Sequence, residues 1–170
     1  NEKGKRFRKM AETAPNVVAA DFDNDGFVDL MSWSSHTFYR NIKGVRFEPL
    51  PGLGLPKSVS RGACWGDFDG DGFVDVFVGG FEDWDAGITY TSFLLMNKSG
   101  TTFETKWSSA TDRTRGVTAC DFDEDGDVDL YASNYRLQAN RLYRNDGKSS
   151  FDDAAPSLNA VATSPGFPGG

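Results

Sequence analysis

The sequence Asp-Phe-Asp-Asn-Asp-Gly-Phe-Val-Asp-Leu fills residues 21–30, and the chain repeats it twice with few changes. The second copy, Asp-Phe-Asp-Gly-Asp-Gly-Phe-Val-Asp-Val, fills residues 67–76, and the third, Asp-Phe-Asp-Glu-Asp-Gly-Asp-Val-Asp-Leu, fills residues 121–130. Each copy follows small or apolar residues and precedes a run that is typical of a β-strand. Because the copies start 46 and 54 residues apart, they indicate a repeat architecture.

A second feature recurs with the same period. It is a turn that starts with Asn and has a Phe six residues later, and its copies are Asn1–Phe7, Asn41–Phe47, Asn97–Phe103 and Asn145–Phe151. A glycine lies inside the last three turns, where a hairpin favours positive φ. One unit therefore reads as strand, acidic loop, strand, strand, Asn turn and strand.

This order predicts an all-β fold without helices, in which four antiparallel strands in ~45 residues form one blade of a β-propeller. The chain then forms one propeller segment with three complete blades at 16–50, 58–107 and 114–155. Residues 1–12 would be the last turn and strand of a preceding blade, and residues 156–170 the connector to a further one. Since propellers close with about four to eight blades, we expect a segment of a longer propeller or an open array that another subunit completes.

The charge is concentrated in the acidic loops. The 170 residues include 25 acidic and 18 basic ones, a net charge of −7, yet the three loops alone hold 14 of the acidic residues and no Lys or Arg. A net negative chain is a poor ligand for nucleic acid, and no run of ~18 apolar residues predicts insertion into a membrane. Clustered carboxylates repel one another unless a cation lies among them.

The spacing within each loop predicts a metal site. In Asp-x-Asp-x-Asp-Gly the first, third and fifth side chains converge, the glycine permits a sharp turn, and the seventh carbonyl and ninth carboxylate complete a shell of hard oxygen ligands that suits Ca²⁺. The loops are not EF-hands, because strands flank them and no Glu occupies position 12. We therefore predict about three Ca²⁺ ions, one per loop, that stabilise the fold.

The predicted ligands are the side chains of the aspartates and the carbonyl at the seventh position, with the Asp127 side chain pointing outward. They are Asp21, Asp23, Asp25, Phe27 and Asp29; Asp67, Asp69, Asp71, Phe73 and Asp75; and Asp121, Asp123, Asp125, Asp127 and Asp129.

These loops, together with Leu-Tyr-Arg-Asn-Asp-Gly…Phe at 142–151, resemble FG-GAP/VCBS repeats, especially those of cartilage acidic protein-like secreted proteins. The resemblance covers essentially the whole chain. It implies a seven- or eight-bladed, Ca²⁺-binding β-propeller that is extracellular, on the cell surface or periplasmic. It also implies adhesion or ligand binding, as in integrin α-subunits, although no Phe-Gly…Gly-Ala-Pro pair flanks the loops here.

Two functions follow as hypotheses. The first is a non-enzymatic binding, adhesion or assembly scaffold for protein or glycan partners. The second is the propeller of a larger secreted lyase, dehydratase or hydrolase whose active site lies elsewhere. The chain itself shows no nucleophile elbow, phosphate loop or zinc spacing, and His36 is its only histidine. We therefore expect no catalytic residue in it.

Three further features are open to two interpretations each. Residues 80–92 form an insertion in which Trp84 and Tyr90 either contact a ligand or pack on their own blade. Cys64 and Cys120 either form a disulfide or remain two buried free thiols. Asn97-Lys98-Ser99 is either a glycosylation sequon of a eukaryotic secreted protein or only a hairpin turn.

Overall fold

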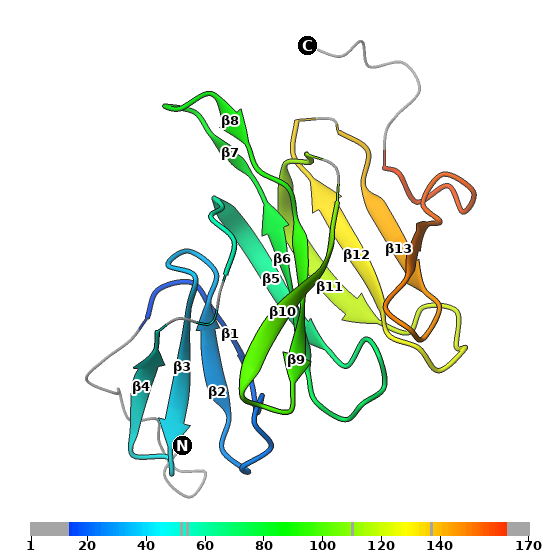
Figure 1. Ribbon diagram of the computed structural model, residues 1–170. Helices are drawn as coiled ribbons and strands as arrows, with labels where there is room; N and C mark the ends of the chain where they lie inside the picture. Colours follow the sequence, from blue (N-terminus) through cyan, green and yellow to red (C-terminus); the bar gives the residue numbers. More distant parts are fainter. Residues whose placement is uncertain (1–13, 52, 54, 110, 137, 163–170) are drawn as a thin grey trace, which may run out of the picture.

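The computed structural model describes residues 14–51, 53, 55–109, 111–136 and 138–162. Within these residues the chain forms β-strands and no helix, so the all-β prediction is confirmed. The strands make three antiparallel four-stranded sheets and one two-stranded hairpin (Figure 1). The predicted strand at 1–12 lies outside the described residues.

Each sheet follows the predicted order of the repeat, with its strands hydrogen-bonded in sequence. The first sheet contains β1 (Val17–Ala20), β2 (Asp29–Ser32), β3 (Thr37–Ile42) and β4 (Arg46–Leu50). The second contains β5 (Ser60–Gly66), β6 (Asp75–Gly80), β9 (Phe93–Lys98) and β10 (Thr102–Ser108). The third contains β11 (Thr114–Cys120), β12 (Asp129–Asn134), β13 (Arg141–Asn145) and β14 (Phe151–Asp153), and the hairpin contains β7 (Glu82–Asp83) and β8 (Ile88–Thr89).

The strand register places the acidic loops in equivalent positions. The last residue of the first strand pairs with the ninth residue of the loop motif in all three sheets: Ala20 with Asp29, Gly66 with Asp75, and Cys120 with Asp129. The loops therefore connect the first two strands of each sheet, and all three lie at the same end of the molecule (Figure 1). The β7–β8 hairpin lies at the opposite end.

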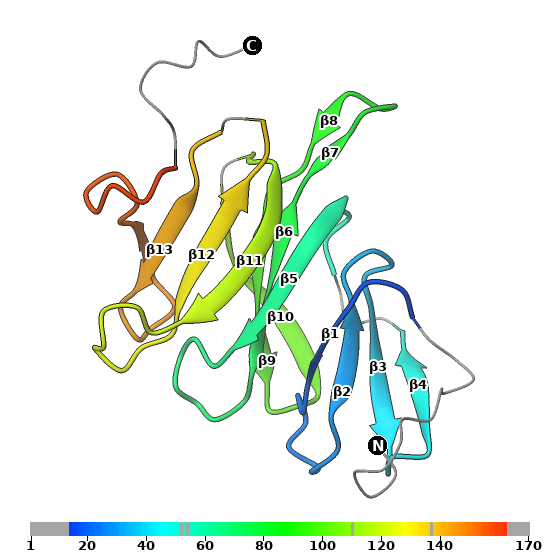
Figure 2. The same cartoon turned by 180° about the vertical axis from the view of Figure 1, so that it is seen from behind.

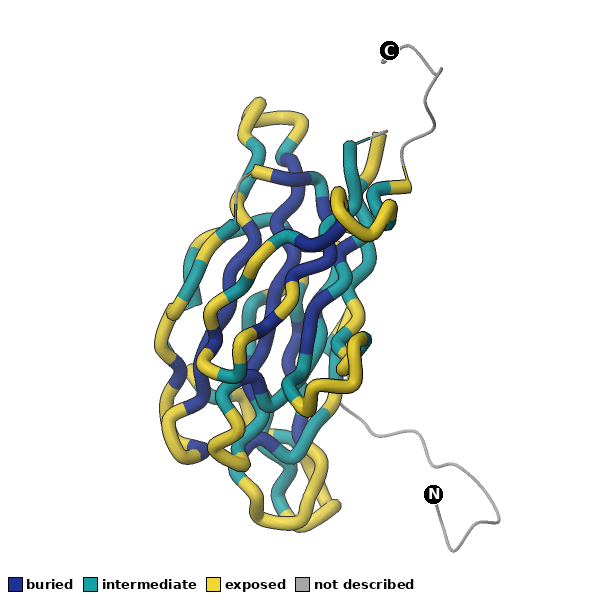
Figure 3. The backbone as a smooth tube through the Cα atoms, turned by 90° about the vertical axis from the view of Figure 1, so that its right-hand side faces the viewer, coloured by how far each residue is buried: buried dark blue, intermediate teal, exposed yellow. Residues whose placement is uncertain are grey.

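The sheets stack face to face as blades do, with their first strands β1, β5 and β11 side by side (Figure 2). Because side chains alternate across a strand, one face of the second sheet packs on the first sheet and its other face packs on the third. The first core includes Phe22, Met31 and Phe38 together with Val76 and Phe93. The second includes residues Phe68, Phe77, Leu94, Leu130 and Tyr143. Figure 3 shows the buried residues gathered along the central strands.

Candidate metal centres

Each acidic loop brings three carboxylates together. The first and third loops bring together the carboxylates of motif positions 1, 3 and 9, and the second loop brings together those of positions 1, 3 and 5. In every group the ligand oxygens lie within 4.8 Å of one another. The groups are Asp21, Asp23 and Asp29; Asp67, Asp69 and Asp71; and Asp121, Asp123 and Asp129. Three carboxylates at this distance repel one another strongly, and a divalent cation between them would remove the repulsion.

The backbone of the loop curls around its first aspartate. Asp21 accepts hydrogen bonds from the amides of Asp25 (3.1 Å) and Gly26 (2.8 Å), and the same two bonds recur in the other loops. Gly26 has a φ of 90°, and its counterparts Gly72 and Gly126 have φ of 89° and 99°. This left-handed turn is one that L side chains adopt with strain, which explains the glycine at position 6.

The aspartate at position 9 connects its loop to the Asn turn of the same sheet. Asp29 is fully buried and accepts hydrogen bonds from the amides of Phe22 (3.3 Å) and Asn41 (2.7 Å). Asp75 and Asp129 are equally buried and make the equivalent two bonds. The sequence thus uses one carboxylate per repeat to hold the acidic loop against the hairpin.

Burial makes these carboxylates unfavourable as free anions. Desolvation raises the pKa of Asp29 to about 6 and that of Asp75 to about 7, and it also raises the pKa of Asp129. The backbone hydrogen bonds oppose this rise, and repulsion from the neighbouring loop aspartates contributes to it. A bound cation would favour the charged form and oppose the rise.

The first loop also holds an unsatisfied acceptor. Asp23 Oδ1 is buried and has no hydrogen-bond partner among the described residues, while its Oδ2 lies 2.7 Å from Arg40 Nε. A buried carboxylate oxygen without a donor is costly, and here it belongs to a group of three carboxylates. The donor set of hard oxygens and this orphaned atom fit a divalent cation such as Ca²⁺.

The other predicted ligands have different surroundings. Asp25 and Asp125 lie outside the three-carboxylate groups, and each accepts a hydrogen bond from the amide two residues later. The Asp127 carboxylate also lies outside its group, and Gly147 of the hairpin faces it, since a Cβ built there would lie 2.6 Å from its oxygens. Coordination by the carbonyls of Phe27, Phe73 and Asp127 stays a prediction.

The Asn turns also connect consecutive sheets, a role that was not predicted from the sequence. Asn97 of the second sheet donates from Nδ2 to the carbonyl of Val74 (3.0 Å) and to that of Phe22 (2.7 Å), which lies in the loop of the first sheet. Asn145 of the third sheet donates in the same way to Val128 and, across the interface, to Phe68. The recurrence of Asn at the same place in every repeat was the available signal.

The predicted glycosylation of Asn97 is wrong for this fold. The side chain is 1% exposed, and its amide nitrogen, where a glycan would attach, makes two hydrogen bonds in the interior. Asn97 is therefore a structural residue.

The cysteines are free thiols, as the second interpretation had it, but they are not both buried. Cys64 and Cys120 are not bridged, and Cys120 is exposed. Cys64 packs in the second core, where burial raises the pKa of its thiol to about 12. Both residues point to the same side of equivalent strands, so the third sheet itself separates them.

The 80–92 insertion forms the β7–β8 hairpin and leaves Trp84 56% exposed, with the Arg136 guanidinium 4.0 Å above its ring. The ring of Trp84 thus contacts Arg136, which follows strand β12 of the third sheet. Tyr90 is half-buried, and its amide donates to Phe81 at the base of the hairpin. Contact of Trp84 and Tyr90 with a ligand stays a prediction.

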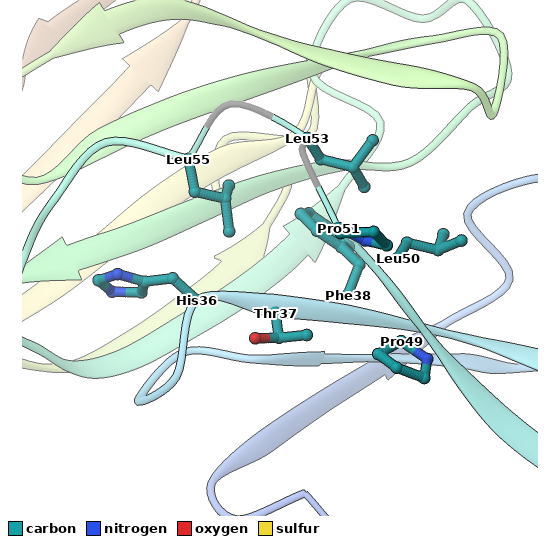
Figure 4. A pocket seen from close by; sticks show the side chains of 8 residues that line it. All are labelled: His36, Thr37, Phe38, Pro49, Leu50, Pro51, Leu53 and Leu55. Atoms are coloured by element: carbon teal, nitrogen blue, oxygen red, sulfur yellow. The ribbon is translucent and has the colours of Figure 1, made fainter.

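A mainly apolar cavity of about 610 Å³ lies beside the first sheet, with His36 at its edge (Figure 4). Its lining residues are His36, Thr37, Phe38, Pro49, Leu50, Pro51, Leu53 and Leu55. The imidazole Nε2 of His36 lies 3.1 Å from Ser60 Oγ, and burial lowers the pKa of His36. No carboxylate lines the cavity to orient or charge the imidazole, as far as the described residues go.

Comparison with known families agrees with the repeat structure. The model of the FG-GAP-like repeat matches twice, at residues 21–78 and 67–132, and these matches contain all three acidic loops. No curated protein matches the chain. A helix able to cross a membrane does not occur in the described part of the chain. From the repeats, the sheets and the loops together, the chain belongs to the FG-GAP-like repeat family.

Proposed function

We propose that the chain is a Ca²⁺-binding part of a larger β-propeller, which acts outside the cytoplasm as a binding or assembly scaffold for protein or glycan partners. The observation that carries this proposal is the threefold recurrence of converging carboxylates beside a buried aspartate. FG-GAP-like repeats generally form non-catalytic binding modules of extracellular or periplasmic proteins, which is consistent with this role. On this reading Ca²⁺ stabilises the scaffold and takes no part in a reaction.

Further blades are proposed because no described residue packs as a further sheet on the outer face of the first sheet. Its apolar residues occupy the positions whose counterparts fill the two cores, yet Val28 is 54% and Val17 is 37% exposed. These residues of the first sheet are Val17, Ala19, Val28, Leu30, Tyr39 and Phe47. Their counterparts in the first core are Ala63, Trp65, Val74, Val76, Leu95 and Phe103, and in the second core Val117, Ala119, Val128, Leu130, Tyr143 and Phe151. An additional repeat packed here would extend the stack by the same contacts.

Asn41 supports the same arrangement. Its side chain donates to Val28 (2.8 Å), as Asn97 does to Val74, but among the described residues it makes no bond that matches the one from Asn97 to Phe22. We propose that the corresponding acceptor of Asn41 is the Phe carbonyl of a preceding acidic loop.

Thermal unfolding tests the metal sites. Addition of Ca²⁺ to the chelated chain should raise Tm by at least about 5 °C, while Mg²⁺, which requires stricter octahedral geometry, should act more weakly. Because protons compete for carboxylates whose pKa values are raised to about 6 and about 7, the Ca²⁺-induced rise should grow from about pH 5 to about pH 7.5. Melting curves that coincide in Ca²⁺ and in excess EDTA would refute the metal sites.

A further inference from the structure

Two arginines are placed by β-bulges at equivalent points of the stack. The pairing of β5 with β6 shifts register between Ser60 and Gly62, and the pairing of β11 with β12 shifts between Thr114 and Gly116. The residues left out of the ladder are Arg61 and Arg115, each six positions before the first aspartate of its acidic loop. Bulges often redirect a side chain at a functional site, and here two consecutive repeats redirect an arginine.

Each of these arginines lies over an aromatic ring that is also equivalent between the repeats. The Arg61 guanidinium is 5.4 Å from the Phe81 ring, and the Arg115 guanidinium is 4.6 Å from the Tyr135 ring. Phe81 and Tyr135 each follow the buried aspartate of their repeat by six residues, and their rings are 6.1 Å apart. The two arginine–aromatic pairs are therefore neighbours.

The β7–β8 hairpin extends the row. Arg136 lies 4.0 Å from the Trp84 ring and 5.8 Å from the Tyr135 ring. The hairpin is fixed at its base by a 2.6 Å ion pair between the buried Glu82 and Arg113. We call the exposed residues of this set the arginine–aromatic surface: Arg61, Trp84, Arg115, Tyr135 and Arg136, with the buried Phe81 beneath Arg61.

The three arginines of this surface are exposed, and none of them forms an ion pair with a described carboxylate, although Asp83 and Asp85 flank Trp84 on the hairpin. Arg113 and Arg141 nearby are instead paired with Glu82 and Asp112. Stacking on a ring occupies the face of a guanidinium and leaves its N–H edge available for a bidentate carboxylate. The β7–β8 hairpin lies at the end opposite the acidic loops (Figure 1). Arg61 and Arg115 lie near the first ends of β5 and β11, and these loops follow the other ends of the same strands, so their negative charge is remote.

We infer that the arginine–aromatic surface binds an acidic segment of a partner protein. Trp, Tyr and Arg are the residues that most often dominate protein–protein binding energy, and arginine clusters recognise acidic motifs through charge-assisted hydrogen bonds. The repetition of the arginine in consecutive sheets suits an extended partner with carboxylates along its length. This inference rests on the proposed role as a binding module and names its partner class, but it does not require Ca²⁺.

To test this inference, binding of a fluorescein-labelled deca-glutamate peptide to the 170-residue chain is measured by fluorescence anisotropy at about 50 mM salt. We expect saturable binding that weakens by more than about tenfold in the double variant R61Q/R115Q. The control R46Q/R144Q removes the same formal charge from exposed arginines outside the surface, of which Arg46 pairs with Glu48, and should change affinity by less than about twofold. W84A should weaken binding while leaving the net charge unchanged.

Three results would overturn the inference: absence of peptide binding, equal weakening in the control variant, or tight binding of a sulfated polysaccharide without binding of the peptide. Ca²⁺-dependent melting of the same variants separates the two proposals. Loss of peptide binding with an intact Ca²⁺ effect removes the inference alone, whereas peptide binding without a Ca²⁺ effect removes the metal sites of the proposed function.

Discussion

The first and second sheets carry nearly the same motifs, yet their surroundings differ. Every residue of β6 in the second sheet is buried, whereas the equivalent β2 has a half-buried Leu30. Asn97 is 1% exposed and bonds across an interface, while Asn41 is only half-buried and bonds within its own sheet. The second sheet has a neighbour on both faces among the described residues and the first on one.

This difference shows that a repeat obtains much of its environment from the adjacent repeat. Val28 is 54% exposed, whereas its counterpart Val74 packs against the first core. Residues with equal local sequence can therefore differ in burial, and substitutions at matched positions measure what the neighbouring repeat contributes.

Substitution of the turn asparagines should give the largest contrast. Asn97→Ala removes three hydrogen bonds in the interior and should lower the free energy of unfolding by about 3 kcal/mol. Asn41→Ala removes two bonds at a half-exposed site and should cost about 1 kcal/mol. Urea unfolding in Ca²⁺ measures both values, and equal losses would mean that the bond to Phe22 contributes nothing to stability.

The turn glycines should give an intermediate contrast. Gly44 and Gly100 have φ of 73° and 71°, so alanine at either position adds left-handed strain of roughly 1 kcal/mol. A Cβ on Gly44 meets only Phe27 at 3.9 Å, but on Gly100 it would lie 2.6 Å from the Asp23 Cα of the first acidic loop. We expect Gly100→Ala to be about 1.5 kcal/mol more destabilising than Gly44→Ala and to weaken Ca²⁺ binding at the first loop, measured by calorimetry. Similar effects of the two variants on both readouts would contradict this contact.

The valines before the buried aspartates should give the smallest contrast. Val74 packs against the first core, whereas Val28 is 54% exposed. Val74→Ala should cost about 1 kcal/mol and Val28→Ala less than about 0.5 kcal/mol in chemical unfolding of this chain. A large cost for Val28→Ala would show that a further repeat or a second copy already covers that face.

Most of the fold could be predicted from local sequence motifs. The acidic loops and Asn turns predicted the order of the strands because both features depend on nearby residues, such as Gly26 at positive φ and Asp21 bonded to the amides that follow it. The clustering of aspartates likewise follows from their spacing, although which three of them converge differs between the loops.

Contacts between repeats could not be predicted from the sequence. Asn97 looks like an exposed sequon until the carbonyl of Phe22, 75 residues away, is placed against it. Cys64 and Cys120 lie on the same face of equivalent strands, and only the stacking of the sheets shows that the third sheet then separates them. Arg61 and Arg115 occupy matching positions in the sequence, but their role depends on bulges that only the pairing of strands reveals.

The hydrogen bond from Asn97 back to Phe22 implies an order of assembly during synthesis, because the donor is made after the acceptor. During synthesis the acidic loop of the first sheet emerges long before the hairpin that braces it, and the second loop waits in the same way for Asn145. The structural unit held together by these bonds therefore consists of one sheet and the Asn turn of the next, and it does not coincide with one sequence repeat. The first two acidic loops thus receive this cross-sheet hydrogen bond only after most of the following blade has been synthesised.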